Sequence, residues 1–168
     1  MRQEIKEVYE LLQAQKEIQT ELLKLGHLKR RAIVRADTGK LTDIVGREQF
    51  YVSKMNSLER KRTKLMPELS ALVSRRGGTM TLGELIDSAQ PEEREALNRL
   101  GRELRLMLFE QLELNSINSK LLEDHLCYAE TMISAAVGRE DPLNNFYGGD
   151  GRCADDRPRK TGFFDRQI

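Results

Sequence analysis

The chain has 168 residues, which suits a single domain, and 33% of them are charged while 39% are hydrophobic. This charge content exceeds the usual ~25% and suits long helices with much exposed surface rather than a compact sphere. The formal net charge of +1 argues against nucleic-acid binding by phosphate neutralisation, and no stretch approaches the roughly 18 apolar residues of a membrane span.

The first predicted element is a helix over about 3–36. Its apolar residues recur at steps of three and four, which is the helical period. Gly26 interrupts this stripe at a cost of about 1 kcal/mol relative to alanine. The turn signal Asp37-Thr-Gly-Lys then ends the helix.

The second predicted helix covers about 40–75 and repeats the same apolar period. Pro67 lies within it and would clash with the preceding turn. We therefore expect either a kink near Met66 or a break, with Pro67 as the first residue of a short new helix. Gly77 and Gly78 end the element.

A short helix is predicted over about 81–89. Thr81 and Glu84 have the spacing of a capping box, in which each residue caps the other at the start of a helix. Pro91 suits the first turn of the next helix, and the acidic residues that follow it favour the same place.

The third long helix is predicted over about 91–137 and carries the most regular apolar seam. Every step along the seam is three or four residues; the seam consists of Leu97, Leu100, Leu104, Met107, Gln111, Leu114, Asn118, Leu121, His125, Tyr128, Met132 and Ala135. Residues 139–168 are rich in Gly, Asp and Arg and are predicted to form a flexible, disordered tail. The fold class is therefore all-α: an elongated antiparallel coiled-coil-like bundle of three long helices, within a helical domain of residues 1–138.

A difference in helix length predicts an open surface. At 1.5 Å per residue the last helix is about 70 Å long and the first about 50 Å, so one end of the last helix projects from an antiparallel bundle. A partner's amphipathic helix could complete the bundle there. The alternative is an ordinary core, because apolar stripes more often form core than binding sites. The candidate partner-binding residues at this end are Leu114, Ile117, Leu121, Leu122, Tyr128 and Met132.

Polar residues interrupt the same seam at Gln111, Asn118 and His125. A buried asparagine in a helical seam fixes its register and the number of partners. On this interpretation Asn118 and His125 join the candidate partner-binding residues. The alternative is that these side chains face solvent at the margin of the core.

The sequence offers no recognisable catalytic chemistry. His27 and His125 are far apart and have no cysteine or acidic residue at ligand spacing, so we expect no enzyme activity, metal or cofactor. Basic residues gather between Lys24 and Arg35, but they spread around a helix, which favours a solvated face over a nucleic-acid patch. No apolar signal segment begins the chain and the two cysteines form no framework, so we expect a cytoplasmic protein with reduced thiols and no membrane insertion.

Three blocks of sequence together resemble the FlgN family of flagellar type III export chaperones. Their order and spacing carry the resemblance over residues 5–72 and 110–152. The first block is Lys29-Arg-Arg-Ala-Ile-Val-Arg-Ala-Asp37 with Leu41-Thr-Asp-Ile-Val45 and Glu48-Gln49, the second is Met55-Asn-Ser-Leu-Glu-Arg-Lys-Arg62, and the third is Asn115-Ser-Ile-Asn-Ser-Lys-Leu-Leu-Glu123, Tyr128 and Phe146-Tyr-Gly-Gly-Asp-Gly151.

This resemblance implies an all-helical chaperone that binds the C-terminal helices of flagellar hook–filament junction proteins. It would prevent their premature assembly and deliver them to the flagellar export apparatus. The resemblance also implies that Tyr147, in the last block, docks at the export gate. A structural homo-oligomeric coiled coil and a nucleic-acid-associated helical adaptor remain the alternatives, and the oligomeric state stays open.

Overall fold

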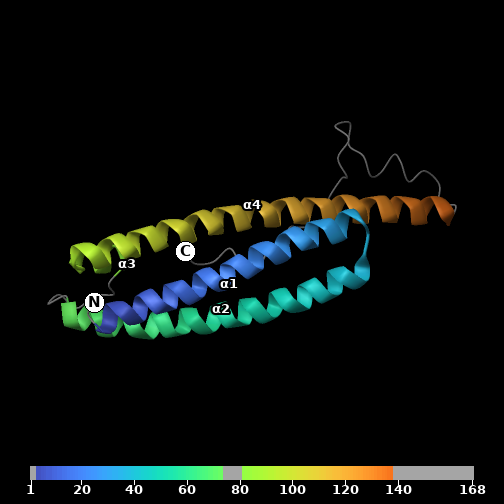
Figure 1. Cartoon of the computed structure of the whole chain (residues 1–168). Coiled ribbons are helices and arrows are strands. Elements are labelled where there is room, and N and C mark those ends of the chain that lie inside the picture. The colour runs from blue at the N-terminus through green and yellow to red at the C-terminus, as the bar shows by residue number, and fades with distance from the viewer. Residues whose placement is uncertain (1–2, 74–80, 138–168) are drawn as a thin grey trace. The chain divides into compact units, whose positions relative to one another are not determined.

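The computed structural model describes residues 3–73 and 81–137, and the regular structure within these ranges is entirely helical. The helices are α1 (Gln3–Val34), α2 (Thr38–Val73), α3 (Leu82–Ser88) and α4 (Pro91–Ala136), as labelled in Figure 1. Their bounds lie close to the predicted ranges. The predicted all-α class, with three long helices and one short helix, is therefore confirmed, whereas the coiled-coil arrangement stays a prediction.

The chain separates into two compact units, Met1–Leu121 and Leu122–Ile168. The first unit holds α1, α2, α3 and the first part of α4, and the second unit begins within α4. The predicted boundary between a helical domain and a tail, at 138/139, lies outside the described residues, and so does the predicted end of the second helix at Gly77 and Gly78.

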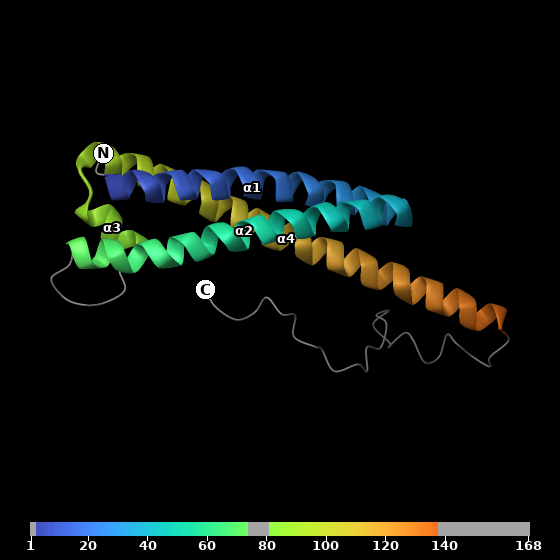
Figure 2. The same ribbon diagram turned by 90° about the horizontal axis from the view of Figure 1, so that it is seen from below.

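The helices α1 and α2 form a hairpin, lying side by side in opposite directions (Figure 1 and Figure 2). The turn between them is closed by Ala36, whose φ of 51° is left-handed, and by a hydrogen bond from Asp37 N to Ala32 O of 3.0 Å. Such a bond satisfies carbonyl groups that a helix end leaves unpaired. Next to the turn, Leu25, Ala32 and Ile44 are buried together and hold the two helices in contact.

A larger core lies toward the beginning of α1 and joins all four helices of the first unit. Each fully buried aliphatic side chain in such a core contributes about 1.5–3 kcal/mol. The buried members are Ile5, Val8, Leu12, Met66, Leu85, Ala89, Leu97 and Leu100. Because α3 and the start of α4 belong to this core, they fix where α4 begins its path along α1.

The predicted capping box at the start of α3 is confirmed. Glu84 N donates to Thr81 Oγ1 at 3.3 Å, and Thr81 N donates to Glu84 Oε2 at 2.7 Å. The Thr81 backbone N–H, and after it the Thr81 hydroxyl that donates to Glu84 Oε2 at 3.0 Å, lower the pKa of the Glu84 carboxyl. The placement of Pro91 as the first residue of the following helix is confirmed as well.

Of the two outcomes expected at Pro67, the break is wrong, because α2 continues through this residue to Val73, whereas the kink near Met66 stays a prediction. A proline inside a helix costs about 3 kcal/mol, since its ring clashes and its backbone donates no hydrogen bond. Met66 is buried in the larger core and Leu65 packs against it. The burial of these two side chains offsets much of the cost and keeps the helix in place.

The expectation of reduced thiols is wrong for Cys127, which is buried and disulfide-bonded. Cys153, the other cysteine of the chain, lies outside the described residues. Cysteine spacing does not by itself decide whether two cysteines pair, so the sequence carried no signal for this bond.

Candidate partner-binding surface

The first part of α4 follows α1 in the same direction. Lys16 Nζ lies 2.6 Å from Glu103 Oε2, and further along both helices Gln19 Nε2 donates to Gln111 Oε1 at 3.4 Å. The Lys16 ammonium lowers the pKa of the Glu103 carboxyl through its hydrogen bond. Consecutive long helices of the first unit therefore run in opposite directions, and α1 covers one side of α4.

The two helices approach closely at Gly26. A Cβ atom built on this glycine would lie 2.6 Å from Leu114 Cδ2, which is too short for any ordinary contact. Leu114 itself is only 4% exposed. Gly26, which interrupts the apolar stripe of α1, is thus the position at which the Leu114 side chain of α4 packs against the α1 backbone.

Asn118 is bound within the chain at the same place. Its side chain is 2% exposed, and its Nδ2 donates to Gly26 O at 3.0 Å. Its Oδ1 has no hydrogen-bond partner among the residues that the structure describes. A polar group that is buried in a helical seam restricts the register of that seam, so Asn118 fixes the position of α4 along α1.

The remaining candidate residues are much more accessible. Ile117 is 38% exposed, Leu121 and Leu122 are half-buried, and His125 is exposed. Tyr128 and Met132 are more than half exposed. The structure therefore brings Leu114 and Asn118 together against α1 and leaves the later seam residues partly or fully open to solvent.

Two exposed residues of this region are absent from the predicted seam. Leu126 is 62% exposed and Ile133 is 63% exposed. Steps of four and seven place Leu122, Leu126 and Ile133 in one row of α4, and a step of four places Tyr128 and Met132 in a second row, about 120° further round the helix. We call these five residues the C-terminal face of α4; all of them belong to the second unit.

A separate apolar row lies on α4 within the first unit. Leu106, Phe109 and Leu112 follow one another at steps of three and are each more than 60% exposed. The sequence shows this spacing of apolar residues, but the three residues lie outside the dominant seam, and the prediction did not include them. They provide a natural comparison for the C-terminal face, because they share its helix and its chemistry.

The described residues offer little for metal or membrane chemistry. Within 3–73 and 81–137 no group of three or more His, Cys, Asp or Glu side chains could hold a metal ion. His27 lies 3.6 Å from Glu110 on the surface, whereas His125 is exposed. None of the described helices has the length and apolar character that crossing a membrane requires.

The sequence matches the model of one protein family, described as FlgN protein, over residues 1–154. This range contains the four helices and the block around Tyr147, which itself lies outside the described residues. No curated protein and no solved structure matches the chain.

Proposed function

Because the chain belongs to the FlgN family of flagellar export chaperones, we propose that its substrates are the hook–filament junction proteins, bound through their C-terminal helices. The chaperone keeps these helices from assembling early and delivers the proteins, in the cytoplasm, to the flagellar type III export apparatus. One observation carries the choice of surface: the C-terminal face of α4 exposes leucine, tyrosine, methionine and isoleucine side chains together.

The physical basis is burial of apolar surface. A junction protein's amphipathic helix packs against the exposed rows of α4 and removes both apolar faces from water. A standard interface buries about 1,600 Å² in total, and a micromolar complex corresponds to about 8 kcal/mol. Moderate affinity suits a chaperone that must release its substrate, and the binding step needs no metal or nucleotide.

The candidate residues have two proposed roles, according to whether they are buried or accessible. Leu114 and Asn118 hold α4 against α1 and position the helix rather than contact the substrate. The accessible side chains make the contacts; they are Ile117, Leu121, Leu122, His125, Tyr128 and Met132, together with Leu126 and Ile133.

Substitution of one row residue tests this surface. Leu122→Asp and Leu126→Asp each place a charge on the C-terminal face, and we expect each to weaken binding of a junction-protein C-terminal segment by at least about tenfold, which is 1.4 kcal/mol. Isothermal titration calorimetry measures the affinity, and circular dichroism checks that the helices persist.

Leu106→Asp is the matched control for Leu126→Asp in particular, because it makes the same change on the same helix at a leucine of similar exposure. We expect it to bind the segment like the unchanged protein. Equal weakening by Leu106→Asp, or unchanged binding by both row variants, would reject the C-terminal face as the substrate site.

Docking at the export gate is proposed for a different part of the chain. Tyr147 lies in the Phe146-Tyr-Gly-Gly-Asp-Gly151 block, and tyrosine is favoured at the centre of interfaces. We expect Tyr147→Ala to leave the affinity for a junction protein unchanged and to lower its export, as measured by the amount secreted into the medium. Loss of substrate binding in the same variant would show that the block is not a separate docking element.

A structural homo-oligomer is the second candidate function, since a second copy of the chain could also cover the C-terminal face. Native mass spectrometry at micromolar concentration separates the two. A monomer that binds a junction protein supports the chaperone, whereas a stable dimer that loses this surface supports the homo-oligomer.

A further inference from the structure

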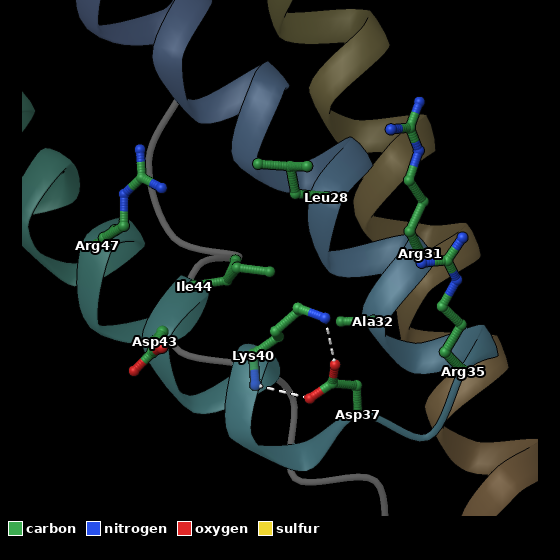
Figure 3. Close-up of a pocket in the computed structure, with 9 residues that line it drawn as sticks. All are labelled: Leu28, Arg31, Ala32, Arg35, Asp37, Lys40, Asp43, Ile44 and Arg47. Atoms are coloured by element: carbon green, nitrogen blue, oxygen red, sulfur yellow. Dashed lines mark hydrogen bonds and ion pairs between the residues drawn. The ribbon is translucent and has the colours of Figure 1, made fainter.

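A pocket of about 380 Å³ lies beside the turn that joins α1 to α2, within the first unit. Figure 3 shows the side chains of the two helices around it. Its lining from α1 consists of Leu28, Arg31 and Ala32, its lining from the turn consists of Arg35 and Asp37, and its lining from α2 consists of Lys40, Asp43, Ile44 and Arg47.

The lining repeats the same spacing on both helices. Leu28 and Ala32 are four residues apart on α1, with an arginine three residues after each of them. On α2, Lys40, Asp43, Ile44 and Arg47 again follow one another at steps of three, one and three. This spacing places each set on one side of its helix, so the two helices enclose an apolar floor with charged rims.

The floor and the rims differ in accessibility. Ala32 and Ile44 are buried and hold the hairpin together, whereas Leu28 is 40% exposed and offers its aliphatic side chain to the pocket. Arg31, Arg35 and Arg47 are all exposed. An occupant would therefore meet an aliphatic surface at the bottom and guanidinium groups at the edges.

The charges of the rim do not cancel. Lys40 is matched by Asp37, which accepts from Lys40 Nζ at 2.7 Å and from Lys40 N at 3.0 Å. These hydrogen bonds lower the pKa of the Asp37 carboxyl, so the pair stays neutral overall down to acid pH. The other charged residues of the lining are three arginines and one carboxylate, Asp43, and no ion pair joins these arginines to an acidic side chain within the described part of the chain.

We propose that this pocket is a second docking site, for an acidic amphipathic helix of a partner protein. A leucine or isoleucine of that helix packs on Leu28 and the floor, and glutamate or aspartate residues one turn away pair with Arg31, Arg35 and Arg47. Guanidinium groups bind carboxylates through two parallel hydrogen bonds, which makes arginine well suited to this recognition. The pocket shares no residue with the C-terminal face of α4, so this proposal can be tested independently of the proposed function.

The chemistry of the pocket favours a polypeptide over a nucleic acid. Asp43 and Asp37 would repel a phosphate backbone, and an aliphatic floor gives a ribose-phosphate chain nothing to pair with. A peptide helix carries carboxylates and aliphatic side chains at the same steps of three and four that the pocket presents.

The test uses the whole chain and a designed probe. The probe is a fluorescein-labelled helical peptide with leucines four residues apart and glutamate three residues after each leucine; its control has glutamine in place of glutamate. Fluorescence anisotropy at low salt is expected to show binding of the glutamate probe and at least tenfold weaker binding of the glutamine probe. Absence of measurable binding of the glutamate probe would overturn the proposal.

Variants locate the binding. Arg31→Glu and Arg47→Glu are each expected to weaken the glutamate probe at least tenfold, and Leu28→Ala is expected to weaken it several-fold. Arg30→Glu is the matched control, because Arg30 is an exposed arginine of α1 that does not line the pocket. An equal effect of Arg30→Glu would overturn the site in favour of general charge attraction.

Two further measurements distinguish this pocket from the C-terminal face and from a polyanion site. Leu122→Asp is expected to leave probe binding unchanged, because Leu122 belongs to the C-terminal face and does not line the pocket. A labelled single-stranded oligothymidylate serves as the nucleic-acid probe. If it binds as tightly as the glutamate peptide and Arg31→Glu and Arg47→Glu weaken it equally, the pocket is a polyanion site and the proposal fails.

Discussion

Gly26 sets the distance between α1 and α4. Read from the sequence, it is a residue that costs helix stability. In the structure the Leu114 side chain occupies the space that a side chain at position 26 would need. The carbonyl oxygen of Gly26 accepts a hydrogen bond from Asn118 Nδ2. A single backbone position thus combines close packing with a polar restraint on register. The sequence could not predict this role, because nothing local to Gly26 indicates which helix lies against it.

A double-mutant cycle tests this packing. Gly26→Ala gains about 1 kcal/mol of helix propensity, whereas overpacking a core typically costs about 1–3 kcal/mol. We expect Gly26→Ala to lower the free energy of unfolding or leave it unchanged in the natural chain, and to raise it by about 1 kcal/mol when Leu114 is already alanine. Urea unfolding measures all four variants. Equal effects in both backgrounds would show that the two residues do not meet.

At the scale of elements, the helices were predictable and their contacts were not. Helical periodicity, the capping box at Thr81 and the proline at the start of α4 are local signals, so they located the helices well. Which side of α4 is covered depends on helices distant in sequence. The seam therefore predicted Leu114 and Tyr128 as equivalent, although one is buried and the other is exposed. The exposed row at Leu126 and Ile133 was missed for the same reason.

Polar contacts between elements should make stability depend on pH. Glu59 of α2 accepts from Nε and Nη2 of Arg62 and, at 3.1 Å, from Gln15 Nε2 of α1. The Arg62 guanidinium, above all through its hydrogen bond, holds the pKa of the Glu59 carboxyl below its usual 4.5. A carboxyl whose pKa is lowered by folding stabilises the folded state above its unfolded pKa. That contribution is lost as the pH falls through the lowered value.

Glu59→Gln is therefore expected to lower the free energy of unfolding at pH 7. The size of this decrease should shrink as the pH falls below about 4.5. Urea unfolding between pH 7 and pH 3 measures the difference from the natural chain. The control is Glu113→Gln, at an exposed glutamate that makes no hydrogen bond or ion pair among the described residues. A difference between Glu59→Gln and the natural chain that stays constant with pH would contradict the assignment.

At the scale of the whole molecule, the buried core and the C-terminal face of α4 belong to different units. Both clusters of buried apolar side chains lie in the first unit, whereas the C-terminal face of α4 lies in the second. A chaperone gains from this division, because substrate binding can bury apolar surface that folding does not use. The sequence predicted the excess of apolar residues on the last helix. It could not predict where the chain's own core ends, since that depends on Gly26 and Asn118.

Site-specific photocrosslinking tests most directly whether the C-terminal face of α4 binds the substrate. Benzoylphenylalanine replaces Tyr128 in one variant and Phe109 in another, which compares two exposed aromatic positions of α4. Each variant is irradiated with a full-length hook–filament junction protein. We expect a crosslink to the C-terminal helical region of that protein from position 128 and none from position 109. A crosslink of equal or greater yield from position 109, or none from position 128, would contradict the proposed surface.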